Sequence, residues 1–130
     1  MKIFGIGTDI VNIKRIDQSL KKYGITFKKK IFSEKEIAYC EKKRNPSSFY
    51  AKRFAAKEAF SKALGTGIRK GVNLKNIEIL NDSNGKPLIK LKGNLANFLR
   101  KKIKAKKYYI YLSLSDDKPW AQATVIISYN

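Results

Sequence analysis

The sequence predicts one α+β domain in which an antiparallel sheet packs on a long helix, with shorter helices around it. Two observations support this fold class. An apolar run near the start and segments in the second half that alternate apolar and polar residues indicate strands, and the alanine-rich segment 49–64 indicates a long helix. A length of 130 residues fits a single domain, 1–130, with one modest core.

The first strand and the first helix follow one another directly. Residues 3–11 form an apolar run that contains Gly5 and Gly7, which predicts a buried strand whose backbone bends or is closely approached by another element. Residues 13–23 then place apolar residues on one side of a helix and basic residues elsewhere.

Two more helices are predicted before the middle of the chain. Ser33 followed by Glu36 is a capping box, which predicts a helix over 34–42. The segment 49–64 is the strongest helix signal because it is rich in alanine and is followed by glycine at position 65.

The second half alternates between strand and helix signals. Asn84 and Gly85 form a hairpin signal between two short alternating runs. Asn94 can cap a helix that ends near Lys104. The strands predicted here are residues 76–80, 87–91, 108–115 and 121–128.

Charge and composition restrict the possible functions. The chain has 29 Lys and Arg against 10 Asp and Glu, a formal charge of +19, which indicates an anionic partner: nucleic acid, a membrane surface, or an acidic small molecule or protein. There is no histidine and Cys40 is the single cysteine, so the usual zinc sites, Ser-His-Asp triads, Cys-His pairs and an internal disulfide are excluded. Without a signal peptide or an apolar membrane span, we expect a cytoplasmic protein.

The remaining chemistry depends on carboxylates, lysines, hydroxyls or a hard metal ion. Asp9 lies inside an apolar run, where a carboxylate is costly unless it is paired or binds a metal. With Glu58 it would form the carboxylate pair that Mg²⁺ prefers beside phosphates and water. The alternatives are that Asp9 caps a turn, and that Glu58 and Lys62 form an i,i+4 ion pair on an amphipathic surface helix.

Four blocks of the chain resemble a known family. The blocks GIGTDIVNIKRI, FSEKEIAYC, RFAAKEAFSKALGTGI and LSLSDDKPWAQATVII are similar, in order and spacing, to holo-acyl-carrier-protein synthases. These are the small bacterial 4′-phosphopantetheinyl transferases, and the resemblance covers nearly the whole chain. It implies the fold of that family.

The resemblance also implies a reaction. Enzymes of this family transfer the 4′-phosphopantetheine group from coenzyme A, their co-substrate, to a serine of apo acyl carrier protein, and release adenosine 3′,5′-bisphosphate. Asp9 and Glu58 match the family's Mg²⁺ ligands, and Glu58 and Lys62 are its candidate catalytic residues. Phosphoryl transfer needs positioning and charge stabilisation more than a covalent protein intermediate.

By the same resemblance, four residues would bind coenzyme A. Lys62 matches a lysine near its phosphates, and Arg53 matches an arginine that we assign to the 3′-phosphate of the nucleotide. Gly65, in the block Gly65-Thr66-Gly67, either lets the backbone approach the ligand or simply caps the helix. Lys86 lies where the family has a turn close to the nucleotide, although Asn84 and Gly85 fit an ordinary hairpin turn.

One position departs from the family pattern. The family's final motif usually ends Ser-x-Ser-His, whereas here Ser115 is followed by Asp116. The deprotonation of the carrier serine then falls to Glu58 or a magnesium-bound water, which we favour, or to Asp116 or Asp117. A carboxylate at position 116 would repel a phosphate-rich ligand.

The partners follow from the resemblance as well. The first helix carries Arg15, Gln18 and Lys22, where the family docks the acidic carrier protein; the alternative is a solvated basic face. The family forms homotrimers with sites between subunits, and the tyrosine-rich run 108–111 is compatible with such an interface. The rival hypothesis is a non-enzymatic basic protein that binds nucleic acid, because charge and aromatic residues alone would explain that function. We expect neither nucleic acid nor membrane as partner.

Overall fold

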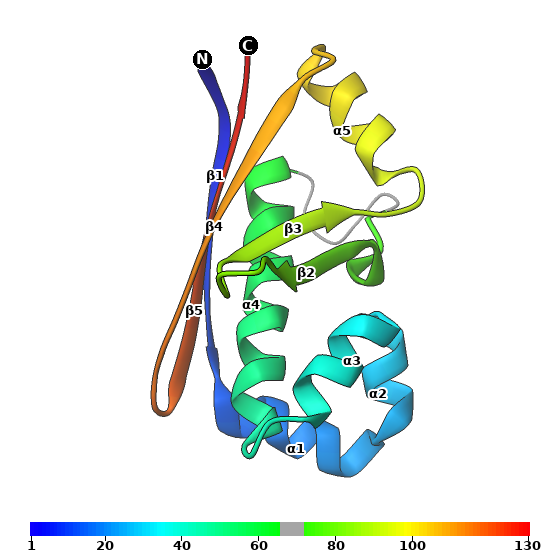
Figure 1. Ribbon diagram of the computed structural model, residues 1–130, viewed down its shortest axis with the longest axis vertical. Coiled ribbons are helices and arrows are strands. Elements are labelled where there is room, and N and C mark those ends of the chain that lie inside the picture. The colour runs from blue at the N-terminus through cyan, green and yellow to red at the C-terminus, as the bar shows by residue number, and fades with distance from the viewer. Residues whose placement is uncertain (66–71) are drawn as a thin grey trace.

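The computed structural model describes residues 1–65 and 72–130, and its elements form three layers, of which the central helix α4, Pro46–Leu64, is the middle one (Figure 1). A three-stranded sheet covers one side of α4, and a two-stranded hairpin with short helices covers the other. The predicted α+β class is therefore confirmed. Helix α4 begins before the predicted position 49 because Pro46 occupies its first turn, where the missing N–H is not needed.

The three-stranded sheet contains β1, β5 and β4, in that order, and all pairs are antiparallel. These strands span Lys2–Asn12, Trp120–Tyr129 and Tyr108–Asp117. Alternate residues of β5, from Ala121 to Ile127, are fully buried against α4, so the apolar alternation seen in the sequence forms the main core. The sheet brings the two ends of the sequence side by side (Figure 1).

Gly5 and Gly7 allow α4 to lie directly on the backbone of β1. A Cβ at Gly5 would overlap the carbonyl oxygen of Ala63, and a Cβ at Gly7 would overlap that of Ala59. The pairing register also shifts between Ile3 and Gly5. The close approach predicted for these glycines is confirmed, and it sets the separation between β1 and α4.

The opposite side of α4 carries shorter elements. The hairpin strands β2 and β3 form a sheet of their own, so the described strands make two antiparallel sheets where the sequence predicted one. Helix α2 was not predicted, because its seven residues are too few to show a helical period. These elements are α1 (Ile13–Tyr23), α2 (Ile25–Ile31), α3 (Glu34–Glu41), η1 (Leu74–Asn76), β2 (Ile77–Asn81), β3 (Pro87–Leu91) and α5 (Leu95–Ile103).

The interpretation of α4 as an amphipathic surface helix is wrong. Arg53, Lys57 and Ser61, on its polar side, are all at least 98% buried, because α3 and β2 pack on them. Lys57 forms an ion pair with Glu36 of α3, with Nζ 2.8 Å from Oε1. Burial lowers the pKa of Lys57, and the charge of Glu36 opposes that shift. Among the described residues, no helix combines the length and apolar composition of a membrane span.

Candidate active site

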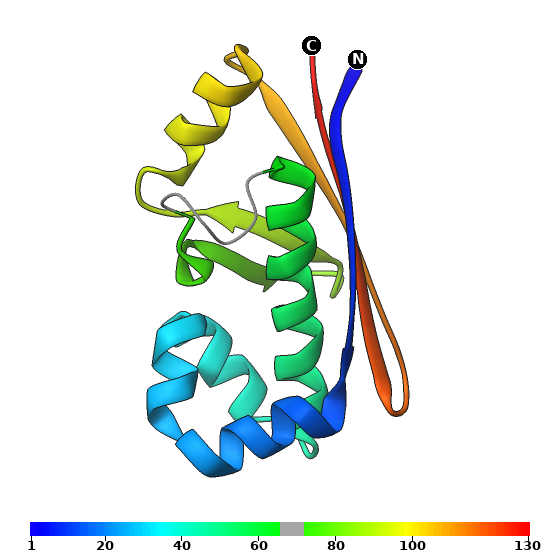
Figure 2. The ribbon, with the colours of Figure 1, turned by 180° about the vertical axis from the view of Figure 1, so that it is seen from behind.

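The contact between β1 and α4 brings together three of the predicted site residues: Asp9, Glu58 and Lys62. Figure 2 shows β1 running alongside α4. Asp9 follows Gly7 by two positions, so its side chain points to the same face of the strand, toward α4. Lys62 Nζ donates to Asp9 Oδ1 and to the carbonyl oxygen of Thr8, both at 3.0 Å. Lys62 therefore bridges to β1, and among the ion pairs of the described residues none joins it to Glu58.

The two carboxylates influence each other electrostatically. Burial raises the pKa of Glu58, the charge of Asp9 raises it further, and Lys62 lowers it. The side chain of Asp9 is only 15% exposed. Two acidic groups that share a half-buried site favour either a proton or a cation between them.

This donor set fits Mg²⁺. Within residues 1–65 and 72–130, no group of three or more His, Cys, Asp or Glu side chains could by itself enclose a metal ion. Mg²⁺ commonly binds through one or two carboxylates and completes its shell with water and substrate phosphates. Asp9 and Glu58 supply those carboxylates, and Lys62 adds a positive charge beside them.

Arg53 lies on the other side of α4. Its Nη2 donates to Asn81 Oδ1 at 2.8 Å, and its guanidinium stacks on Tyr39 with 4.1 Å between Cζ and the ring centroid. It lines a cavity of about 300 Å³ with Lys35, Tyr39 and residues of β2. Within one chain, the structure therefore does not bring Arg53 to Asp9 and Glu58.

The other two residues assigned to coenzyme A occupy exposed ends of elements. Gly65 caps α4 in the left-handed conformation, with φ of 89°, at the end nearest Lys62. Lys86 lies exposed in the turn between β2 and β3, where its N–H donates to Asp82 Oδ1. Thr66 and Gly67, which belong to the same predicted block as Gly65, lie outside the described residues.

Asp116, at the position of the family histidine, forms an ion pair with Lys52, with 3.4 Å between Nζ and Oδ1. It lies near the end of β4, opposite Ala121, whereas Asp9 pairs with Ala123 on the other edge of β5. The sheet thus places Asp116 two strands away from Asp9.

Helix α1 presents Arg15, Gln18 and Lys22 on one exposed face. Arg15 also lines a groove of about 350 Å³ between α1, α4 and the end of β1. The groove includes Ile10, which follows Asp9, and the apolar side chains of Phe27, Phe54 and Trp120. A basic helix and an apolar groove thus lie at the end of β1 that carries Asp9.

Lys57 and Glu36 form a buried ion pair that no local sequence pattern indicates. The capping box did reveal the local role of Glu36, since its side chain accepts from the N–H of Ser33. The contact of Glu36 with Lys57 of α4 joins residues 21 positions apart, and local sequence patterns do not indicate contacts at that separation.

Comparison with known proteins identifies the family. The model of the 4′-phosphopantetheinyl transferase superfamily matches residues 5–124. The chain belongs to this superfamily. A holo-[acyl-carrier-protein] synthase of Pelagibacter ubique is 46% identical over 127 residues, covering 98% of each chain. That of Caulobacter vibrioides strain NA1000 is 46% identical and covers 96% of this chain and 95% of its own.

Solved structures of this superfamily share the fold. The holo-[acyl-carrier-protein] synthase of Neisseria meningitidis is 40% identical, with a TM-score of 0.88 over 98% of this chain and 99% of its own. That of Helicobacter pylori, solved in complex with coenzyme A, is 35% identical, with a TM-score of 0.82 over 95% and 99%. The resemblance to holo-acyl-carrier-protein synthases is therefore confirmed.

Proposed function

We propose that the chain transfers the 4′-phosphopantetheine group from coenzyme A to a serine of apo acyl carrier protein, with Mg²⁺ as cofactor and adenosine 3′,5′-bisphosphate as product. The observation that supports this reaction is the grouping of Asp9, Glu58 and Lys62 between β1 and α4. The names of the relatives and the coenzyme A complex of the Helicobacter pylori protein support the same substrates.

Each residue at this site has a distinct role in the proposal. Asp9 and Glu58 would hold Mg²⁺, which when bound neutralises charge on the pyrophosphate of coenzyme A. Lys62, held at Asp9, contributes a further positive charge to the phosphates as the leaving group departs. Glu58 is the group that takes the proton of the carrier serine, because it lies at this site, whereas Asp116 is two strands away from Asp9 and engaged with Lys52.

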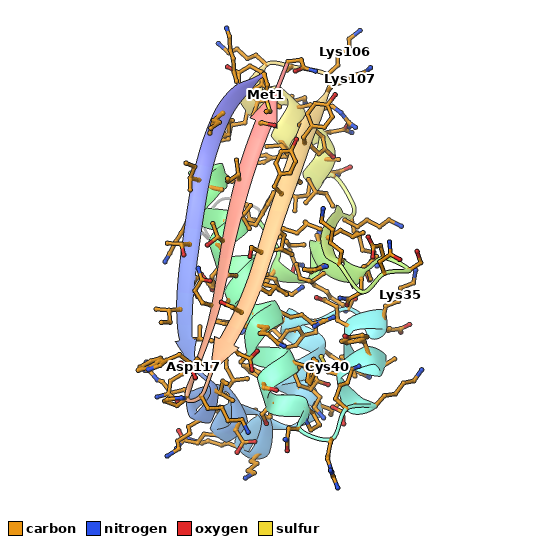
Figure 3. All side chains as sticks on the ribbon, turned by 60° about the vertical axis from the view of Figure 1, so that its left-hand side comes forward. Met1, Lys35, Cys40, Lys106, Lys107 and Asp117 are labelled. Carbon is orange, nitrogen blue, oxygen red and sulfur yellow. The ribbon has the colours of Figure 1, made fainter. Side chains whose placement is uncertain are left out.

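We further propose that the site is completed between the subunits of a homotrimer. Arg53 lies on the side of α4 that faces away from β1, and Asn81 links it to the turn that carries Lys86, so we assign these two residues to a coenzyme A held at the carboxylates of a neighbouring chain. The outward face of the sheet is open to solvent, and among the described residues no element covers it (Figure 3). Large apolar side chains are exposed on it: Ile3, Ile6, Ile10, Tyr109 and Tyr111. A patch of this kind marks an association surface, and light scattering would give the oligomeric state.

Acyl carrier protein would dock on α1. Arg15, Gln18 and Lys22 offer positive charge and hydrogen bonds to an acidic partner, and the groove beside Arg15 receives apolar side chains. The groove is lined by the end of β1, from Ile10 to Asn12, so a carrier held there would lie at the end of β1 that carries Asp9. The cytoplasmic location stays a prediction.

The deciding experiment incubates the protein with coenzyme A, Mg²⁺ and apo acyl carrier protein, and follows the carrier's mass. We expect the carrier to gain the phosphopantetheine group, and Glu58→Gln to remove most of this turnover. Glu34→Gln, an exposed acid of α3, is the matched control and should behave like the unmodified protein. A folded protein that leaves the carrier mass unchanged would refute the proposal. Steeply salt-dependent binding to random duplex DNA, indifferent to Glu58, would support the nucleic-acid hypothesis instead.

A further inference from the structure

A charged cluster lies buried behind the candidate site, on the side of α4 that faces away from β1. Its centre is Lys57, whose Nζ donates to Glu36 Oε1 at 2.8 Å, to the carbonyl oxygen of Leu74 at 2.8 Å and to that of Ile77 at 2.6 Å. The side chains of Lys57 and Glu36 are both 0% exposed. All three hydrogens of the ammonium group are thus used, so its position is fixed in three directions.

Glu36 extends this contact to two further elements. Its Oε1 also accepts from the N–H of Ser33, at the start of α3, and its Oε2 accepts from the N–H of Ile79, in β2. Ser33 Oγ donates to Glu78 Oε2 at 2.6 Å, which ties α3 to β2 a second time. One buried ion pair therefore joins α3, α4 and the segment η1–β2.

Stability alone does not explain such a pair. Replacing a buried ion pair by apolar side chains of similar volume often leaves stability unchanged or raises it, because taking two charges out of water is costly. Hydrogen bonds of the ion pair differ from apolar contacts in direction: they define one register between the elements they join. The cluster therefore specifies how α4 is rotated and how β2 lies across it.

Both the rotation of α4 and the placement of β2 affect the positions of residues at the proposed site. Glu58 is the next residue after Lys57, about 100° further around α4, so the rotation that seats Lys57 on Glu36 turns Glu58 toward β1. Along β2, Asn81 accepts from Arg53 Nη2 and donates to the carbonyl oxygen of Gly85, which precedes Lys86. The hairpin turn is thus attached to the same face of α4.

We infer that Lys57 is a positioning residue: through Glu36 it sets both the direction of Glu58 toward Asp9 and the placement of the β2–β3 turn that carries Lys86. This inference rests on the proposed function. It assigns to Lys57 no contact with either substrate.

The test compares Lys57→Met with Leu99→Ala. Methionine keeps most of the side-chain length without the charge. Leu99 is fully buried in the main core and makes none of the cluster's hydrogen bonds, so its truncation destabilises the fold while the ion pair between Lys57 and Glu36 keeps all its partners. Both variants are measured at a temperature at which circular dichroism shows them folded. The readouts are Mn²⁺ binding by electron paramagnetic resonance, coenzyme A binding by calorimetry, and kcat and KM for transfer.

We expect folded Lys57→Met to bind Mn²⁺ and coenzyme A at least about tenfold more weakly and to lose kcat by about 100-fold, because displacement by 1 Å costs that much. Leu99→Ala should keep the affinities and kcat of the unmodified protein. Unchanged Mn²⁺ and coenzyme A affinities in folded Lys57→Met, or equal losses in Leu99→Ala, would overturn the inference.

A milder variant covers the case in which Lys57→Met does not fold. Glu36→Asp keeps the charge but withdraws the carboxylate from Lys57, and we expect the same losses to a smaller degree. If this variant binds both ligands normally, the inference is wrong. If the unmodified protein transfers nothing, the proposed function fails, whereas the binding comparison between the variants still decides the role of Lys57.

Discussion

Replacing Gly7 with alanine tests whether the close packing of α4 on β1 sets the positions of Asp9 and Glu58 relative to each other. A Cβ at Gly7 would overlap the carbonyl oxygen of Ala59 and lie 2.7 Å from the nitrogen of Ala63, whereas ordinary contacts begin at 3.4 Å. Both neighbours are backbone atoms of α4, so no side chain can rotate away. The helix must withdraw from β1 by about 1.5 Å to bring the Ala59 oxygen back to an ordinary contact distance.

This withdrawal affects stability and catalysis to different extents. Overpacking of a core costs about 1–3 kcal/mol, and a clash with backbone belongs at the upper end. A loss of about 3 kcal/mol lowers the Tm of a domain of this size by roughly 10 °C. Because Asp9 is on β1 and Glu58 on α4, the same movement separates the two carboxylates, and we expect kcat to fall by about 100-fold.

Thermal unfolding and transfer kinetics measure the two effects. Gly24→Ala is the matched control: Gly24 has φ of 55°, so alanine is strained there, but a Cβ would meet no atom within 4 Å. We expect this control to lose about 1–3 kcal/mol of stability and to keep kcat at saturating carrier protein. If Gly7→Ala, measured at a temperature at which it is folded, has the same kcat as Gly24→Ala, the packing of α4 on β1 does not position the carboxylates.

Three further predictions concern other parts of the chain. Arg15→Glu should raise KM for the carrier protein by about tenfold or more and leave the affinity for coenzyme A intact. The control Lys90→Glu, at an exposed lysine of β3, should change neither quantity. If Arg15→Glu weakens the binding of both substrates equally, Arg15 has a structural role instead. Burial raises the pKa of the Cys40 thiol to about 12, so an aromatic disulfide reagent at pH 7 should label it only after denaturation, and rapid labelling of the native protein would contradict its burial. The Tyr50 hydroxyl and Lys28 lower the pKa of Glu41, so this carboxylate stabilises the fold above the ordinary glutamate pKa of about 4.3, and that stabilisation is lost as the pH falls through the lowered pKa. Glu41→Gln should therefore lower Tm at pH 7, with the difference closing in acid; a difference independent of pH would show that the hydrogen bonds, and not the charge, matter.

Local signals in the sequence predicted most of the fold. The capping box at Ser33 and the hairpin signal at Asn84 and Gly85 depend on neighbours within a few positions, and both features are present in the structure. Asn94 was predicted to cap α5, and it does occupy the N-cap position, although its side chain makes no capping hydrogen bond. Such elements can be predicted from the sequence because the residues that determine them are close together in the chain.

Long-range contacts were predicted less well. The polar side of α4 resembles a solvated face because nothing local shows that Glu36 and Asn81 will cover Lys57 and Arg53. The bridge from Lys62 to Asp9 spans 53 positions, and the local i,i+4 pattern suggested Glu58 as its partner instead. Grouping Asp9 with Glu58 was possible because a carboxylate in an apolar strand is costly, so its position alone called for a partner.

The central place of β5 has a consequence for how the chain reaches its native state. β5 pairs with β1 and with β4, and its contact with β1 joins Lys2 to Tyr129 across almost the whole sequence. Pairings of this range are slow to form, because a long loop must close before they contribute any stability. During synthesis β1 and α4 therefore emerge well before the strand that completes the sheet, and their apolar faces stay exposed until then.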